Sequence, residues 1–230
     1  LVGSEMCIRD RYGIQLSEQG KVNLINTLTN QFNVASAKKT FSECIFIIKK
    51  GKDYIISNSF QRALENDDFK MHVQELIVYG LDRYLDKYRN GLVIGTPFAL
   101  YEKYNYEQVC QLLDWPHNES STIGGYKYSK ETKTLPIFIN YDKDENIQES
   151  IKYEDRFVER DLFIGISKHP RTLKSKELAN IFDADKYGIC IHLFIRKNKN
   201  DKEKFKEFYY LGPVHSTGRK NAKQIQMASG

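Results

Sequence analysis

Tyrosines that stand beside a charged or hydrogen-bonding residue are the feature of this chain most suited to chemistry. The pairs are Tyr126 with Lys127, Tyr141 with Lys143, Tyr153 with Asp155, and Tyr209 with Tyr210. A flat ring can stack on a nucleobase, a polar group can bond the base edge, and a lysine can neutralise a flanking phosphate. The pairs therefore predict contacts to nucleic acid. The alternative is that these tyrosines pack in the core, because strands favour tyrosine for packing alone.

Positive charge is concentrated near the C-terminal end. The chain carries a net charge of +5, and the stretch 196–223 has nine Lys or Arg against three Asp or Glu, a local excess of +6. A second basic group, Lys168, Arg171 and Lys174, precedes a predicted helix, whose N-terminus attracts phosphate. We add these three, Lys197 and Tyr210 to the predicted nucleic-acid-binding residues. A solvated loop with ordinary lysines is the alternative.

Complete patterns for metal binding or catalysis are lacking. The segment 142–146 matches the first three ligand positions of a calcium loop, but Ile147 replaces the required Gly and Tyr153 the required Glu. The five histidines share no zinc spacing with a cysteine. His192, which lies between Ile191 and Leu193, is predicted to be a buried structural residue. We therefore expect no catalytic residue, no metal and no cofactor in this chain.

Length and composition place the chain in a broad class. With 230 residues and 40% hydrophobic content it can build one or two cores. It has no run of about 20 apolar residues, so no membrane association is expected. The four cysteines, Cys7, Cys44, Cys110 and Cys190, form no C-x-x-C pair. This predicts unpaired buried thiols and a cytoplasmic location.

A domain boundary is predicted near Asn90 and Gly91. In residues 13–90, a helix capped by Ser17 runs to Phe32, a hairpin joins 44–48 to 53–56, and a second helix spans 68–88. Helix, hairpin and helix is the order of a winged helix, which would place Lys49, Lys50 and Lys52 of the hairpin tip against DNA. Small α/β segments that bind no DNA also have this order.

Residues 91–230 are predicted to form an α+β domain. The predicted strands are 125–128, 135–141, 161–167, 189–195 and 207–212, with a helix at 174–182. We expect these strands to close into a curved mixed sheet or partial β-barrel with flanking helices.

Five short motifs in this half carry a family resemblance. They are the run 101–115 that ends in Trp115 before a proline, Gly-Gly-Tyr-Lys at 124–127, and the segments 135–143, 153–157 and 208–212. Their order resembles the domain of unknown function at the C-terminal end of bacterial superfamily II (DEAD/DEAH) helicase-nuclease proteins. That family includes type IV restriction enzymes of the SauUSI kind, which cleave DNA with modified cytosine. The resemblance covers residues 97–215.

The resemblance implies a fold, a site and a departure. It implies an SRA- or PUA-like barrel that reads modified bases, and it places Tyr126, Tyr141, Tyr153 and Asp155 in the best-defined motifs. Relatives often carry Trp where this chain has Gly165. If that Trp lines a base pocket, the pocket of this chain is expected to be wider or to differ in specificity.

Both ends of the chain look artificial. Residues 1–11 resemble the translation of a sequencing adapter, so 1–12 are expected to be an artefact or disordered. At the other end, relatives usually continue with another apolar strand after Gly230. We therefore interpret the chain as a fragment of a longer polypeptide, truncated at its C-terminus.

Together these features predict a non-catalytic, DNA-binding target-recognition module of a bacterial, helicase-coupled restriction enzyme that acts in phage defence. Its expected partners are DNA and the helicase and nuclease domains of the same polypeptide. One alternative is a small nuclease domain, for which only Glu131 and Lys133 have part of the required carboxylate–lysine pattern. The other is a protein–protein module that regulates a helicase.

Overall fold

The computed structural model describes residues 17–140, 156–157, 159, 162–166, 174–196, 207–218 and 224–229. The chain divides into two compact units, unit 1 with residues 1–89 and 110–121 and unit 2 with residues 90–109 and 122–230. The sequence did not predict that the segment 110–121 would belong to unit 1. Helix α6 (Tyr106–Leu112) therefore contributes residues to both units.

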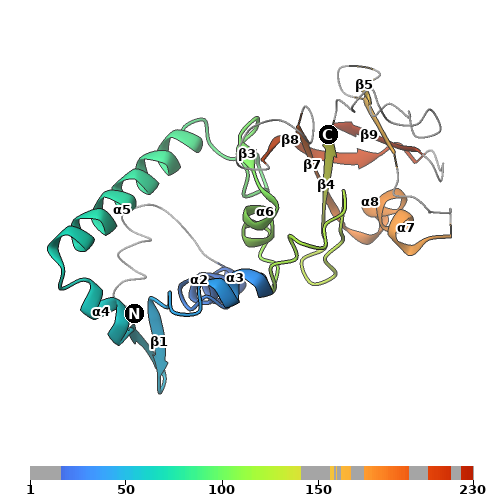
Figure 1. Cartoon of the computed structure of the whole chain (residues 1–230). Helices are drawn as coiled ribbons and strands as arrows, with labels where there is room; N and C mark the ends of the chain where they lie inside the picture. Colours follow the sequence, from blue (N-terminus) through green and yellow to red (C-terminus); the bar gives the residue numbers. More distant parts are fainter. Residues whose placement is uncertain are drawn as a thin grey trace, which may run out of the picture. The chain divides into compact units, whose positions relative to one another are not determined.

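Unit 1 is built from four helices and one hairpin within its described residues (Figure 1). They are α2 (Glu18–Leu28), α3 (Ala35–Thr40), β1 (Ile47–Lys50), β2 (Asp53–Ile56), α4 (Asn58–Ala63) and α5 (Asp67–Lys87). The strands pair antiparallel, and Gly51, at φ +63°, makes the turn between Lys50 and Asp53. The predicted order of helix, hairpin and helix is present, with α3 and α4 as additions. The winged-helix assignment stays a prediction.

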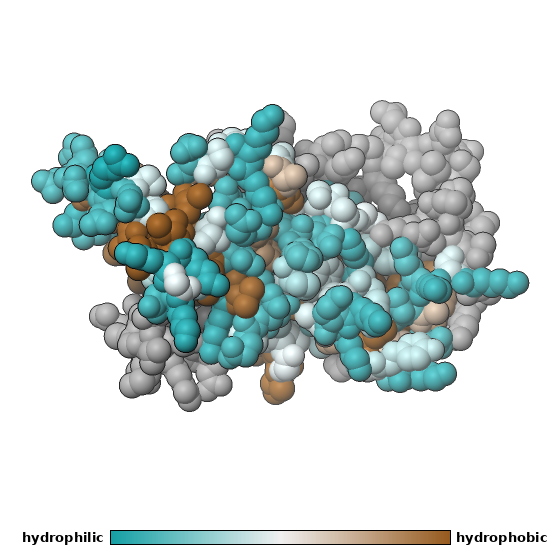
Figure 2. Space-filling view, turned by 90° about the horizontal axis from the view of Figure 1, so that it is seen from below, coloured by the Kyte–Doolittle hydropathy of each residue, from teal (hydrophilic) through white to brown (hydrophobic). Residues whose placement is uncertain are grey.

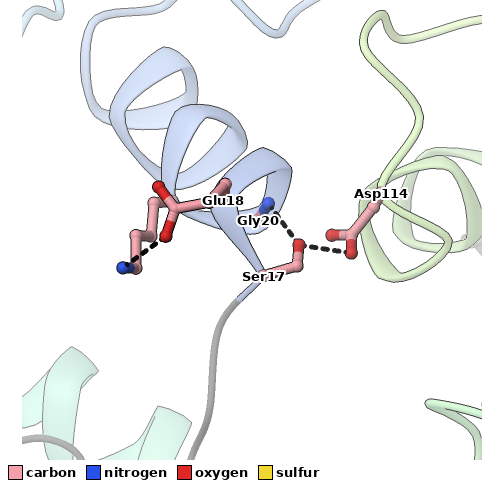
Figure 3. Close-up of polar contacts among 5 residues, drawn as sticks. Ser17, Glu18, Gly20 and Asp114 are labelled. Atoms are coloured by element: carbon pink, nitrogen blue, oxygen red, sulfur yellow. Dashed lines mark hydrogen bonds and ion pairs between the residues drawn. The ribbon is translucent and has the colours of Figure 1, made fainter.

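Helix α2 is held to the segment 110–121 by polar contacts (Figure 3). The Ser17 hydroxyl caps the helix by accepting a bond from the Gly20 N–H at 2.8 Å, and it donates to Asp114 Oδ2 at 2.5 Å. Asn23 is 4% exposed and donates from Nδ2 to the Trp115 carbonyl at 3.0 Å. The cap at Ser17 was predicted. The buried asparagine was not, because it lies outside the apolar stripe.

Helix α5 carries an apolar stripe that the described part of unit 1 leaves uncovered. Leu76, Ile77 and Leu85 are 68%, 59% and 60% exposed, and none of the residues of α5 is buried. Apolar surface gathers at the left of Figure 2, the side on which Figure 1 draws α4 and α5.

Unit 2 is a strongly curved, mixed half-barrel sheet with helices, which confirms the curved mixed sheet that the sequence predicts. Its strand order is β4-β7-β8-β9-β6-β5, with β3 paired to β8. The strands are β3 (Lys103–Tyr104), β4 (Thr134–Asn140), β5 (Arg156–Phe157), β6 (Leu162–Ile166), β7 (Cys190–Arg196), β8 (Phe208–Ser216) and β9 (Gln224–Ser229). The pair β4–β7 is parallel and the others are antiparallel. The specific likeness to SRA or PUA barrels stays a prediction.

The two faces of this sheet bury different kinds of side chain. One face is aliphatic, and α7 (Lys176–Phe182) and α8 (Ala184–Tyr187) pack on it (Figure 1). Its core includes Leu135, Ile137, Leu178, Ile181, Ile191 and Leu193. The other face is aromatic, with Phe98, Tyr104, Phe138, Phe194, Phe208 and Tyr210 in ring contact. Alternate residues of β4 and β7 project to opposite faces, so each strand contributes side chains to both the aliphatic and the aromatic core.

Two strand predictions differ from the structure. The predicted strand 125–128 is reduced to an isolated bridge between Tyr126 and Ile137. Conversely, β9 was not predicted, yet it lies inside the sheet between β8 and β6. Its sequence mixes three polar and three apolar residues. Its place comes from pairing with neighbours distant in sequence, which a local pattern cannot reveal.

Gly165 does not leave the wider pocket that the comparison with tryptophan suggested. A Cβ at this position would lie 3.0 Å from Phe163 Cε1 and 3.4 Å from Ile139 Cδ1. Phe163 is 2% exposed and belongs to the aliphatic core. The space beside Gly165 is therefore filled by its own strand neighbour and by β4.

Candidate nucleic-acid interface

The predicted binding residues are described only in part. Tyr141, Lys143, Tyr153, Asp155, Lys168, Arg171 and Lys197 lie outside the described residues. The calcium-like segment 142–146 lies there as well. Tyr126, Lys127, Lys174 and Tyr210 are described.

Two of the predicted tyrosines are core residues. Tyr126 is 4% exposed and packs in the aliphatic core of unit 2. Tyr210 is fully buried, with its ring centroid 4.8 Å from that of Phe98 and 5.0 Å from that of Phe194. In this structure neither ring offers a face on which a base could stack, so both predictions are corrected here.

The alternation of β8 explains why Tyr210 was the wrong choice. Along Phe208, Tyr209 and Tyr210 the exposure is buried, exposed and buried. Successive side chains of a strand point to opposite faces, so two adjacent tyrosines cannot share one surface. Tyr209, at 43% exposure, is the member of the pair that reaches solvent.

The two described lysines lie at the surface. Lys127 Nζ donates to Thr122 Oγ1 at 2.7 Å, within the same loop. Lys174 is exposed and precedes α7, whose N-cap residue is Ser175. Neither residue is fixed in a geometry that selects a ligand.

Arg196 occupies a more defined position, which the sequence indicated only as the start of the basic stretch. It is the last residue of β7, and its Cα partner on the parallel strand β4 is the last residue there, Asn140. The Arg196 Nε donates to Asn140 Oδ1 at 2.6 Å. The Arg196 Cζ lies 4.4 Å from the centroid of the Phe208 ring. The guanidinium is thus oriented by a hydrogen bond along one edge and by a ring across one face.

Tyr106 adds a hydroxyl to the surroundings of Arg196. Its ring centroid lies 5.3 Å from that of Phe208 and 4.4 Å from that of Phe138. Burial raises the pKa of Tyr106, and the charge of Arg196 acts in the opposite direction. The phenol is therefore protonated at neutral pH and remains a hydrogen-bond donor beside the guanidinium.

The arrangement suits an anion or a base edge. With Nε engaged by Asn140, the described residues leave the two terminal nitrogens of Arg196 as a planar pair of donors. Such a pair binds phosphate or the O6 and N7 atoms of guanine in a bidentate manner. Among the described residues, the structure gives Arg196 no carboxylate partner. The sequence contained one signal for this site, because the apolar runs of β4 and β7 each end in a polar residue. Only the parallel register of the two strands shows that these residues are neighbours.

A second surface combines an exposed ring with a cation. The antiparallel register of β3 and β8 places Lys103 opposite Tyr209. The Lys103 Nζ lies 4.9 Å from the centroid of the Tyr209 ring. Sequence reasoning missed Lys103, since it is distant from Tyr209 in the chain.

The described residues show no assembled metal site or membrane span. No group of three or more His, Cys, Asp or Glu side chains within them could hold a metal ion. None of the helices in the same part of the chain combines the length and hydropathy needed to cross a bilayer. Cys44, Cys110 and Cys190 form no disulfide within the described part of the chain, and Cys110 is buried whereas Cys44 is exposed.

His192 has the structural role that the sequence predicts. It is 2% exposed, and its Nδ1 lies 3.1 Å from the Tyr210 hydroxyl oxygen. Burial lowers the pKa of His192 to about 4. The imidazole is therefore neutral at physiological pH.

Comparison with known proteins identifies two domains. Residues 98–230, more than half of the chain, match a domain of unknown function (DUF3427). Residues 6–88 match a second domain of unknown function (DUF8090). No curated protein matches the chain.

Proposed function

The chain belongs to the family of the domain of unknown function DUF3427, and we propose that in this chain the domain binds DNA as a non-catalytic target-recognition module. The single observation that carries the proposal is the position of Arg196 at the carboxyl ends of two parallel strands. There it is oriented by Asn140 and Phe208, and it has no carboxylate partner among the described residues. A fixed guanidinium of this kind reads phosphate and guanine edges.

Charge supports the same function. Arg196 opens the stretch 196–223, whose local excess is +6. Positive charge on one segment raises the local concentration of a polyanion and speeds its association.

The resemblance of the motifs at 101–115 and 124–127 refines the proposal. It supports a place in a bacterial, cytoplasmic, helicase-coupled restriction enzyme that acts in phage defence and reads a modified base. Its partners would be DNA and the helicase and nuclease domains of the same polypeptide. In unit 1 the hairpin tip, with Lys49, Lys50 and Lys52 around the Gly51 turn, would add backbone contacts if it acts as a wing.

A protein–protein role is the second candidate. The apolar side chains that α5 exposes favour it, because exposed apolar surface of this kind marks protein–protein interaction sites. This role belongs to unit 1 and does not exclude DNA binding by unit 2.

The test is a gel shift with duplex DNA, with and without modified cytosine. Arg196→Gln should weaken binding about 10- to 100-fold, the range for a hydrogen bond to a charged group. Arg196→Lys keeps the charge but loses the planar pair of donors, so it should recover only part of the affinity. Arg89→Gln removes the same charge from an exposed arginine paired with Asp86 and should bind like the wild type.

Three outcomes would overturn parts of the proposal. Wild-type protein that binds no duplex at low salt would remove DNA binding altogether. Equal affinities of wild type and Arg196→Gln would remove Arg196 from the interface. Magnesium-dependent cleavage of plasmid that a point mutation abolishes would replace the binding module by a nuclease.

A further inference from the structure

We propose that Tyr101, Lys103 and Tyr209 form a stacking site for an unpaired nucleobase. This inference rests on the proposed DNA binding and deepens it, because it assigns an unpaired base to a surface separate from Arg196. Arg196 lies over Phe208, whereas Tyr209 projects from the opposite face of β8.

The backbone pairing of β3 and β8 brings these residues to one edge. Lys103 lies opposite Tyr209, with its ammonium 4.9 Å from the ring centroid. The Tyr101 N–H donates to the Tyr210 carbonyl at 2.8 Å, and the Tyr210 N–H donates to the Glu102 carbonyl at 2.9 Å. The segment 101–103 is therefore bound to β8, with the backbone of Tyr101 beside that of Tyr210, the chain neighbour of Tyr209.

Tyr101 is held in a backbone conformation that a bulky side chain rarely adopts. Its φ is +63°, in the left-handed region, while its side chain is 67% exposed. Glycine or asparagine would adopt this φ at lower cost. A large ring placed on a strained backbone, yet mostly in solvent, contributes little to the core, and strain of this kind gathers at functional sites.

The chemistry of the group favours a base with its phosphate. Two exposed rings offer stacking faces, and an ammonium beside one of them can neutralise the flanking backbone charge. Stacking on an aromatic ring tolerates any base, so this surface would hold an unpaired base without reading its identity.

The test compares three fluorescent DNA duplexes at one salt concentration. The first is fully paired, the second carries a single bulged thymidine, and the third carries an abasic residue at the bulge. Wild-type protein should prefer the bulged thymidine to both others. The abasic duplex separates stacking on a base from recognition of a bent backbone.

Variants then assign the preference to the residues. Tyr209→Ala and Tyr101→Gly should each lower the affinity for the bulged thymidine about 5- to 100-fold, the range for loss of one stacked base. Both should leave the affinity for paired DNA unchanged. Tyr101→Gly should at the same time raise the melting temperature, because it relieves the strain at φ +63°. A merely structural Tyr101 would give the opposite result, a lower melting temperature with unchanged DNA preference.

The matched control is Tyr187→Ala. Tyr187 is 48% exposed, and the Lys186 Nζ lies 5.5 Å from its ring centroid, so it reproduces the pair of exposed ring and cation on α8. It should keep the preference for the bulged thymidine.

The outcomes separate this inference from the proposed function. Tight binding to paired DNA without any preference for the bulged thymidine would overturn the stacking site and leave the proposed function intact. A preference that survives at the abasic bulge, or in both tyrosine variants, would also overturn it. Failure to bind any of the three duplexes would overturn the proposed function together with this inference.

Discussion

His192 and Arg196 project from the same face of β7, yet their surroundings give them opposite properties. His192 lies deep in the aromatic core and is neutral, whereas Arg196 lies half-buried at the strand end. The difference follows from their positions along the strand, because the aromatic core ends and solvent begins at the end of β7.

The stability of the protein should depend on pH through His192. Its pKa is about 4 in the folded state, against about 6.5 in the unfolded chain. Between these values the unfolded state binds a proton that the folded state does not. The free energy of unfolding should therefore be unaffected above pH 6.5 and fall as the pH drops toward 4, by up to about 3 kcal/mol.

Urea unfolding at several pH values measures this effect. His192→Phe should make the free energy of unfolding nearly independent of pH between 6.5 and 4. The substitution can also change stability by a constant amount at every pH, which does not alter this test. His215→Gln is the control, since exposed His215 pairs with Asp185 at the surface. Identical profiles for the wild type and His192→Phe would show that His192 does not cause the dependence.

Two glycines should respond oppositely to alanine. At Gly165 a Cβ would meet the buried Phe163 ring at 3.0 Å, so Gly165→Ala should destabilise the protein by about 1–3 kcal/mol. At Gly80 no atom lies within 4 Å of the added Cβ, and the residue is inside helix α5. Gly80→Ala should therefore stabilise the protein by about 1 kcal/mol. Thermal melts of both variants provide the measurement. A Gly165→Ala variant at least as stable as the wild type would contradict the packing at Gly165.

At the scale of elements, the side chains at the start of β8 alternate between the buried core and the solvent-exposed surface. Phe208 and Tyr210 belong to the aromatic core, and Tyr209 between them reaches solvent. The same strand thus supplies a core ring and a surface ring at adjacent positions.

Adjacent tyrosines of β8 should therefore differ in their effect on stability. Tyr210→Ala removes a fully buried ring and should cost about 3–5 kcal/mol of unfolding free energy. Tyr209→Ala removes a ring that is 43% exposed and should cost less than about 1 kcal/mol. Chemical denaturation of the two variants checks the difference, and similar costs would mean that the burial along β8 is misassigned.

The N-terminus of α2 should depend on the Ser17 hydroxyl. Ser17→Ala removes the acceptor for the Gly20 N–H and the donor to Asp114, and should cost about 1 kcal/mol. Ser17→Asn keeps both a capping oxygen and an N–H donor, so it should stay close to the wild type. Urea midpoints compare the three proteins. A variant Ser17→Ala as stable as the wild type would show that these bonds add nothing to unit 1.

At the scale of the whole molecule, charge should govern association with DNA. The net charge is +5, and the stretch 196–223 holds a local excess of +6. Binding should weaken as salt rises, with a log–log slope of about −0.9 for each phosphate that the protein neutralises.

Affinities measured at several salt concentrations give this slope. Arg196→Gln should make the slope shallower by about one phosphate contact. The fully buried Tyr210 should not affect the slope in any variant that still folds. An affinity that stays constant from low to physiological salt would contradict an electrostatic interface.

Much of the local structure followed from the sequence alone. The Ser17 cap, the hairpin with its basic turn and the strands β4, β6, β7 and β8 lie close to their predicted places. Capping, turn chemistry and apolar runs act over a few residues, so a local pattern contains what is needed to predict them. Buried His192 followed in the same way from its apolar neighbours.

Only the tertiary structure decided which residues meet. Sheet pairing joined Arg196 to Asn140, Lys103 to Tyr209 and strand β9 to its neighbours, across separations that no local pattern spans. Sheet pairing also placed Tyr210 in the core and Tyr209 at the surface, because the register of a strand decides which of two adjacent rings faces inward. The predicted tyrosine site was wrong at Tyr210 for this reason, because the sequence shows both rings and only the register decides which one is buried. It was wrong at Tyr126 because a single bridge to Ile137 brings this residue into the aliphatic core.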